Sequence, residues 1–280
     1  MANISIILPT IGRKSLLLAL NSIYEQMYQD FEVIVVDDSV NQNIEIEDHP
    51  KLIVLQTGGD RGVSFARNLG FSHSTSDWIA FADDDDVWHF EKLNKQMQLI
   101  QKENLDLLLT SANVVSTFTS KRPKKLLKVG ESPYQALYGR PHILRSDYYF
   151  PTASILVRAS YLKNFLFNEE LEDRENIKLL QDIYLFGGKL AQMKESLVTI
   201  KYNSQKSLGR AEVISEQIWL QHLGKVNENF ATNFAIESAR NFVRVYENKN
   251  ALLVLSQIKI STPRQRMYII FLKILCHLLK

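Results

Sequence analysis

The feature that most constrains the fold is an alternation of short apolar runs with stretches of helical spacing through residues 1–115. The apolar runs predict strands over residues 4–8, 31–36, 52–55, 78–81 and 107–115. The stretches between them predict helices over residues 14–26, 63–71 and 90–101. Nearly continuous apolar strands that alternate with helices are typical of a mostly parallel sheet covered on both faces. We therefore predict an α/β, doubly wound fold.

Beyond residue 115 the pattern is looser. It predicts a strand over residues 153–158, an interrupted helix over 177–191 and a last strand over 197–202. From near residue 211 to residue 280 the spacing is helical. We therefore expect an α/β domain over residues 1–210 and a C-terminal helical region over residues 211–280.

Composition excludes several classes of protein. The net charge is +2, which gives no field of the kind that attracts nucleic acid, and no nucleic-acid partner is expected. The single cysteine, Cys276, excludes a disulfide within the chain and a thiolate zinc site. No apolar stretch approaches the roughly 20 residues that span a bilayer, and residues 1–10 lack the pattern of a signal peptide. These features predict a cytoplasmic protein.

Polar residues follow three of the predicted strands. Pro9 and Thr10 follow the first strand, Asp37 and Asp38 the second, and residues 83–86 (DDDD) the fourth. In an open parallel sheet, ligands bind beyond the carboxyl ends of the strands. Carboxylates this close repel one another unless a cation lies among them, and oxygen ligands favour Mg²⁺ or Mn²⁺. The alternative to a metal site is an acidic, solvated loop.

Two common phosphate-binding motifs are missing. No G-x-G-x-x-G follows the first strand, and no G-x-x-x-x-G-K-[ST] is present in the sequence. This argues against a dinucleotide-dependent oxidoreductase and against a P-loop enzyme. A bound nucleotide would have its diphosphate held by a metal ion instead of a glycine-rich cradle.

Four segments in order resemble the motifs of the family 2 glycosyltransferases, which have the GT-A fold. They are residues 5–13 (SIILPTIGR), 35–39 (VVDDS), 62–70 (GVSFARNLG) and 79–88 (IAFADDDDVW). The resemblance covers residues 3–205 and implies that the α/β domain is the catalytic domain. The helical region lies outside it.

The resemblance implies contacts to a nucleotide-sugar donor. Pro9 and Thr10 would contact the nucleoside, and Asp38 would contact the edge of the base. Arg67 would lie near the donor pocket, although it could equally cap the C-terminus of its short helix.

The acidic run is similar to the D-x-D motif of the family. Asp83 would bind the ribose or the sugar, and Asp85 would ligate the Mn²⁺ or Mg²⁺ that bridges the diphosphate. Asp84 is also assigned to donor binding, but relatives carry a small residue at its position. Asp86 would instead lie near the start of the next helix, where a negative charge is favourable.

The resemblance also implies a catalytic base. Family members have an acidic pair, usually Glu-Asp, that opens a helix beyond the D-x-D motif. Residues 180–186 (LQDIYLF) are similar to that motif and make Asp182 the base, with Gln181 where glutamate is customary. The pair Glu172 and Asp173 is the rival assignment.

The resemblance predicts an inverting glycosyltransferase that moves a sugar, from a UDP-sugar by expectation, to the hydroxyl of a saccharide or lipid-linked acceptor. It places the protein in bacterial surface-polysaccharide or lipooligosaccharide synthesis. Two other hypotheses stay open. One is a catalytically silent nucleotide-sugar-binding protein, and the other is a nucleotidyltransferase that makes the sugar nucleotide.

The last predicted helix, residues 264–280, combines apolar residues with scattered basic ones. Helical spacing puts Met267, Ile270, Ile274, Leu275 and Leu278 on one stripe. This stripe either packs on the helical region or on a second subunit of a homodimer, or it lies in the membrane interface at the inner face of the membrane.

Overall fold

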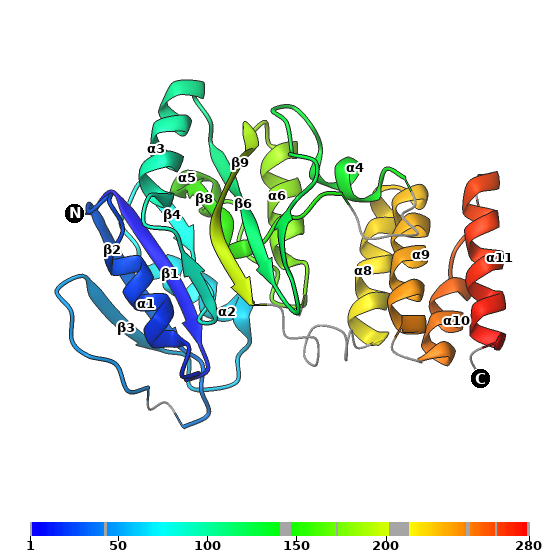
Figure 1. Ribbon diagram of the computed structural model, residues 1–280, viewed down its shortest axis with the longest axis horizontal. Coiled ribbons are helices and arrows are strands. Elements are labelled where there is room, and N and C mark those ends of the chain that lie inside the picture. The colour runs from blue at the N-terminus through cyan, green and yellow to red at the C-terminus, as the bar shows by residue number, and fades with distance from the viewer. Residues whose placement is uncertain are drawn as a thin grey trace. The chain divides into compact units, whose positions relative to one another are not determined.

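The computed structural model describes residues 2–41, 44–140, 147–171, 173–201, 213–244, 247–260 and 262–278. The chain forms two compact units: Met1–Glu131 with Tyr148–Tyr202, and Ser132–Asp147 with Asn203–Lys280. The first unit is an α/β structure and the second is made of helices (Figure 1). The expected domain boundary after residue 210 falls outside the described residues.

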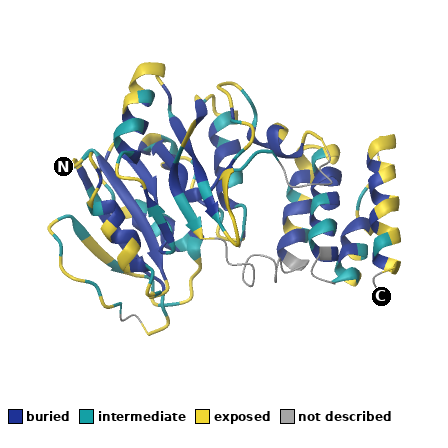
Figure 2. Ribbon diagram, in the orientation of Figure 1, coloured by how far each residue is buried: buried dark blue, intermediate teal, exposed yellow. Residues whose placement is uncertain are grey.

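A single sheet runs through the first unit, and four of its strands are parallel in the order β3-β2-β1-β4. Its first elements are β1 (Ile4–Thr10), α1 (Leu16–Tyr24), β2 (Phe31–Asp37), β3 (Leu52–Gln56), α2 (Val63–His73) and β4 (Trp78–Phe81). Every residue of β1 and β4 is buried, as Figure 2 shows. This agrees with the continuous apolar runs in the sequence, which lack the alternation of a sheet with one wet face.

Beyond β4 the sheet continues as β8-β6-β9-β5 and becomes mixed. Strand β8 is antiparallel to β4 and β6, β9 is parallel to β6, and β5 is antiparallel to β9. The remaining elements of this unit are β5 (Asp86–Trp88), α3 (Lys92–Glu103), β6 (Leu107–Val115), β7 (Thr119–Arg122), a 3₁₀ turn η1 (Thr152–Ser154), β8 (Ile155–Arg158), α5 (Ala159–Leu162), α6 (Glu175–Leu185) and β9 (Leu190–Lys201). The helix predicted over 177–191 therefore ends early, because β9 already begins at Leu190. Asp86 lies in β5 and not at the start of α3, so its expected helix-terminal role is wrong.

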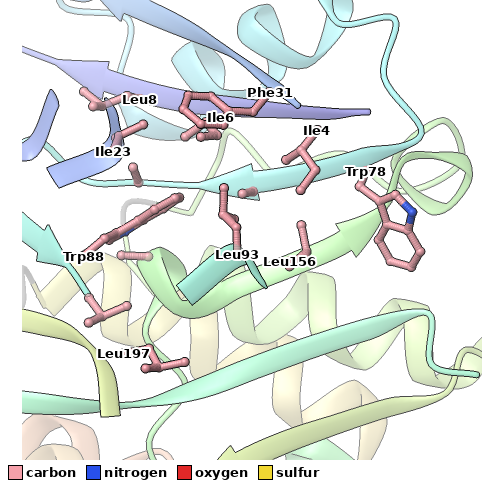
Figure 3. Close-up of a cluster of buried hydrophobic side chains, with 14 of the residues drawn as sticks. Ile4, Ile6, Leu8, Ile23, Phe31, Trp78, Trp88, Leu93, Leu156 and Leu197 are labelled. Atoms are coloured by element: carbon pink, nitrogen blue, oxygen red, sulfur yellow. The ribbon is translucent and has the colours of Figure 1, made fainter. Parts of the chain in front are cut away.

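The core of this unit occupies both faces of the sheet. On one face, Ile6 and Leu8 of β1 lie in a cluster with Ile23 of α1 and Leu93 of α3 (Figure 3). On the other face, α2 packs so closely that a Cβ atom built on Gly70 would lie 2.6 Å from the side chain of Ile7. Helices thus cover both faces, which confirms the predicted doubly wound α/β class.

The second unit consists of helices. They are α4 (Pro133–Tyr138), α8 (Val213–Val226), α9 (Glu228–Arg244), α10 (Asn248–Ser256) and α11 (Pro263–Leu278). Trp219 of α8, Phe234 of α9 and Tyr134 of α4 are almost fully buried in its core. In the described part of the chain, no helix is long and apolar enough to cross a bilayer.

Candidate active site

The loops that follow β1, β2 and β4 surround a cavity of about 170 Å³. Its lining residues are Pro9, Thr10, Ile11, Arg13, Asp38, Val63, Asp83, Asp84 and Asp85. These strands are parallel neighbours, so their carboxyl ends meet at one edge of the sheet. The structure therefore brings together every residue predicted to contact donor or metal except Arg67.

Backbone hydrogen bonds extend the sheet into this edge. The amide of Asp38 donates to the carbonyl of Thr10 at 2.8 Å, and the amide of Ala82 donates to the carbonyl of Ile7 at 3.0 Å. The pairing thus continues one residue past β2 and past β4. The side chains that follow enter the cavity from well-defined backbone positions.

Asp38 holds the loop that leads into α2. Its Oδ1 accepts hydrogen bonds from the backbone of Arg61 (2.8 Å) and from the Thr57 hydroxyl, and its Oδ2 accepts one from the amide of Gly62 (2.9 Å). Gly62 has φ of 88°, a conformation that favours glycine. Asp38 therefore fixes the wall of the cavity on this side, in addition to any contact with a nucleoside.

Asp84 points away from solvent and ties the acidic run to the end of β1. Its Oδ1 accepts a hydrogen bond from Nη1 of Arg13 at 2.5 Å, and its Oδ2 accepts one from the Thr10 hydroxyl at 2.7 Å. Only 2% of the Asp84 side chain is exposed. Arg13 was not predicted as a site residue, although it closes the first motif. In this structure Asp84 positions Thr10 and Arg13, whereas Asp83 and Asp85, which also pair with Arg67 and Arg13, are 31% and 47% exposed in the cavity.

Arg67 connects the acidic run to a second helix. The side chain is buried in the middle of α2, so the alternative of a C-terminal cap is wrong. Its Nη2 donates to Asp83 at 2.7 Å and its Nη1 donates to Glu175 at 2.6 Å. Burial raises the pKa of Glu175, and the charge of Arg67 lowers it in part. Glu175 was not predicted from the sequence. It could have been recognised as the acidic residue at the start of α6.

The acidic run carries more negative charge than its neighbours balance. Burial, together with the charges of Asp83, Asp85 and Asp84, raises the pKa of Asp86 to about 9. Burial also raises the pKa of Asp85, against the opposing charge of Arg13. Such carboxylates favour a cation among them.

The residues present fit a divalent ion that takes some of its ligands from the protein and the others from a substrate. Within the described ranges, no three acidic, histidine or cysteine side chains are grouped as metal ligands. Asp83 and Asp85 nevertheless line the cavity together, and Asp85 is 47% exposed. Mg²⁺ is usually held by one or two carboxylates and completes its shell with phosphate oxygens and water. A protein site with two carboxylates therefore suits an ion that arrives with a diphosphate.

Asp182, the predicted base, is not among the residues that line the cavity. It lies seven residues after Glu175 on α6, about 10 Å along the helix axis. Its carboxylate accepts a hydrogen bond from Nζ of Lys178 at 2.5 Å. Asn176, beside Glu175, is buried and donates to the carbonyl of Phe150.

The rival acidic pair is only partly visible. Asp173 forms an ion pair with Arg174 at 2.6 Å, and Glu172 lies outside the described residues. The helix therefore opens with Glu175-Asn176, where the resemblance expects Glu-Asp, and the assignment of Asp182 stays a prediction.

Comparison with known proteins gives a consistent set of similarities. The model of the family described as Glycosyl transferase family 2 matches residues 5–165, more than half of the 280 residues. An uncharacterized glycosyltransferase of Haemophilus influenzae is 35% identical over 102 residues, which are 35% of this chain and 35% of that protein.

Two further relatives carry more specific names. One is the UDP-Glc:alpha-D-GlcNAc-diphosphoundecaprenol beta-1,3-glucosyltransferase WfgD of Escherichia coli, 27% identical over 40% of this chain and 47% of that protein. The other is the amylovoran biosynthesis glycosyltransferase AmsB of Erwinia amylovora, 28% identical over 48% of this chain and 50% of that protein. The chain thus spans half or less of the length of these curated relatives.

Solved structures show similarity over nearly the whole chain. TarS 1–349 of S. aureus aligns with a TM-score of 0.58 at 16% identity, covering 92% of this chain and 91% of that one. The same protein in complex with UDP aligns with a TM-score of 0.56 at 18% identity, covering 98% and 89%. At this identity the likeness shows the fold.

Proposed function

This chain belongs to glycosyltransferase family 2 and has the GT-A fold, and we propose that it transfers a sugar from a nucleotide-diphosphate donor to an acceptor hydroxyl. The observation that carries the proposal is the cavity at the ends of β1, β2 and β4. Residues from three separate motifs line it, and the carboxylates of its acidic run carry more negative charge than the neighbouring basic side chains balance.

The proposed donor is a UDP-sugar. The name of WfgD specifies UDP-Glc, and TarS has been solved with UDP and with UDP-GlcNAc. In this chain, Pro9, Thr10 and Asp38 would border the nucleoside, and Asp83 the ribose or the sugar. Arg67 is deeply buried and paired with Asp83, so its proposed role near the donor pocket is to fix the position of Asp83.

The proposed metal is Mn²⁺ or Mg²⁺. Asp85 and Asp83 would hold it, and oxygens of the diphosphate would supply further ligands. When bound, the ion would stabilise the negative charge that develops on the departing nucleoside diphosphate. Arg13, which is 38% exposed at the mouth of the cavity, would add positive charge on the same side.

The proposed displacement is inverting, with a carboxylate of α6 as general base. Asp182 would accept the proton of the acceptor hydroxyl while that oxygen attacks the anomeric carbon, and Lys178 would have to release Asp182 first. An α-linked donor would give a β-linked product. Glu175 is the rival, but accepting a proton would weaken its ion pair with Arg67, so its proposed role is to position Arg67 and Asp83.

The proposed acceptor is a saccharide on a lipid diphosphate, the acceptor class in the name of WfgD. This would place the protein at the inner face of the membrane, in the assembly of a bacterial polysaccharide.

The test is a transfer assay with the full chain. UDP-glucose and UDP-GlcNAc are each offered with Mn²⁺ and with a synthetic GlcNAc-diphospho-polyprenol, and both UDP release and the extended product are measured. Product formation supports the transferase. A silent binding protein would show UDP binding in a thermal-shift assay without UDP release or product.

A nucleotidyltransferase would release pyrophosphate from a nucleoside triphosphate and a sugar phosphate. If that reaction ran and sugar transfer did not, the proposal would be wrong.

A further inference from the structure

Helix α11 has apolar side chains on two opposite faces. One face is buried in the helical unit and comprises Gln265, Tyr268, Ile269, Leu272 and Cys276. The other face comprises Met267, Ile270, Phe271, Ile274 and Leu278, whose exposed fractions run from 48% to 74%. The two sets have the same spacing and are offset by two residues, about 200° around the helix. We call the second set the open face of α11.

The helix therefore does not need the open face for packing within its own unit. The sequence predicts that one stripe containing Met267, Ile270 and Ile274 is either packed or offered to a membrane. In the structure α11 packs through the opposite stripe, and the predicted stripe stays in solvent. A continuous exposed apolar stripe marks an interaction surface, unlike single exposed leucines, which are ordinary.

The charged side chains of α10 and α11 have one sign. Residues 248–280 contain six lysines and arginines and no aspartate or glutamate. Helical spacing places Arg266 and Lys273 along one border of the open face and Arg264 along the other, and all three residues are exposed. A partner for this surface must accept apolar side chains at its centre and positive charges at its rim.

We propose that the open face of α11 binds an anionic lipid surface, with the helix axis in the plane of the interface. An interfacial helix combines an apolar stripe that enters the acyl boundary with basic residues near the headgroups. A second copy of the chain is a poorer fit, because a twofold contact would bring the basic borders together without acidic partners. This surface belongs to the helical unit and the cavity belongs to the α/β unit, and lipid binding by α11 does not depend on the proposed transfer reaction.

The experiment is flotation of the full chain with two kinds of vesicle, phosphatidylglycerol with phosphatidylethanolamine, and phosphatidylcholine alone. The chain should float with the anionic vesicles and much less with the neutral ones. Replacing Ile270→Gln, Phe271→Gln and Ile274→Gln together should lower the partition coefficient at least tenfold. Replacing Arg266→Gln and Lys273→Gln should lower it about 25-fold on anionic vesicles, since each basic residue near such a surface contributes about fivefold.

A matched control replaces exposed apolar residues elsewhere. Leu17→Gln with Leu18→Gln changes two leucines of α1 that are 50% and 54% exposed, and it should leave flotation unchanged. Thermal unfolding and UDP binding should be unchanged in the α11 variants, so a failure of lipid binding is distinguishable from a failure of the proposed donor site.

Three results would overturn the proposal. The full chain could fail to float, or the triple variant could float as well as the unchanged chain. Alternatively, light scattering could show a dimer that the triple variant converts to a monomer, with no vesicle binding in either form. The last result would assign the open face to a second copy.

Discussion

The cavity at the ends of β1, β2 and β4 and the open face of α11 depart from the usual distribution of side chains in opposite directions. At the cavity, charged side chains are buried: Arg67, Asp84 and Glu175 are each less than 9% exposed, and each has an ion-pair partner. On α11, large apolar side chains are exposed. Buried, paired charges fix a geometry, whereas exposed apolar side chains offer a surface to something outside the chain. Each region thus differs from an ordinary protein region in the kind of residue that lies outside its usual environment.

The largest expected effect is on turnover, and it tests whether catalysis needs Asp182, which lies outside the buried ion pairs of Arg67, Asp84 and Glu175. Asp182 is 23% exposed and is paired with a lysine one helical turn away, unlike the buried acids. If it is the general base, Asp182→Asn should lower kcat about 10²–10⁴-fold while UDP affinity stays nearly the same. Steady-state kinetics and calorimetry measure the two quantities.

Asp173→Asn is the matched control for Asp182, because it changes an acid of the segment that precedes the same helix and should have little effect on kcat. If Glu175→Gln lowers kcat with UDP affinity unchanged and Asp182→Asn leaves kcat unchanged, the base is Glu175, because loss of a positioning role would also weaken UDP binding through Asp83.

The next effect tests the buried network directly. Arg67→Met leaves Glu175 buried without its partner, which should lower the free energy of unfolding by about 3–5 kcal/mol. With Arg67 gone, the pKa of Glu175 rises further above its unfolded value, so the unfolded state ionises more readily than the folded state. Stability is then lost as pH rises, and the deficit in urea unfolding should be larger near pH 7 than near pH 5.

Lys259→Met is the control for Arg67. It removes an ion pair with Glu228 in which both side chains are mostly exposed, 81% and 63%. Its effect should be about 0–1 kcal/mol. Equal losses for the two variants would show that burial does not distinguish the two regions.

A smaller effect tests the acidic run. Asp85→Asn removes a proposed metal ligand, so the gain in UDP affinity that Mn²⁺ brings should fall at least as much as the roughly 10–100-fold typical of losing a residue that only supports a ligand, as measured by calorimetry. Asp48→Asn, at an exposed acid that does not line the cavity, should keep the whole gain. UDP affinity that is the same with Mn²⁺ and with chelator in the unchanged chain would remove the metal from the proposal.

The smallest effect concerns Lys92 of the first unit, which, unlike Arg67, Asp84 and Glu175, is buried without an ion-pair partner among the described residues. Lys92 is fully buried over the ring of Trp88, and its Nζ has no hydrogen-bond partner among the described residues. Burial lowers the pKa of Lys92 well below its usual value, so as the pH falls below about 10 the unfolded state takes up a proton more readily than the folded state does. Lys92→Met should therefore raise the free energy of unfolding by about 1–3 kcal/mol at neutral pH, and less near pH 10.

Lys95→Met, at a partly exposed lysine of the same helix, should change stability by less than about 1 kcal/mol in the same urea titration. A loss of stability in Lys92→Met would mean that the amine stabilises the fold at this position.

The sequence allowed the first half of the sheet to be predicted, because strands buried on both faces leave unbroken apolar runs. In the second half, strands β6 and β8 were predicted, but their order and direction in the sheet were not. Strand β8 lies antiparallel between β4 and β6, and no local pattern sets that direction. Strand β5 has three residues, too few for any period. Helix α4 was also missed, although Ser132 and Pro133 are a recognisable start signal.

The lining of the cavity was predictable for a related reason: its residues follow directly after apolar strands. The partners that hold them were not, because they come from distant parts of the chain. Helix α6 begins after Arg174, which has φ of 59° and gives no side-chain cap. Because the sequence has no start signal here, it does not indicate that Glu175 opens this helix, and the resemblance led to Asp182 instead.

The ion pairs of Arg67 cannot all form at the same stage of protein synthesis. Arg67 and Glu175 are 108 positions apart, so the guanidinium has no carboxylate from α6 until that helix has been synthesised. Closing so long a loop has an entropic cost that only the finished sheet offsets. A growing chain with β1 to β4 complete would still hold Arg67 and Asp83 without this anchor. The ion pairs that hold Asp83 in place can therefore be complete only after α6 has been synthesised.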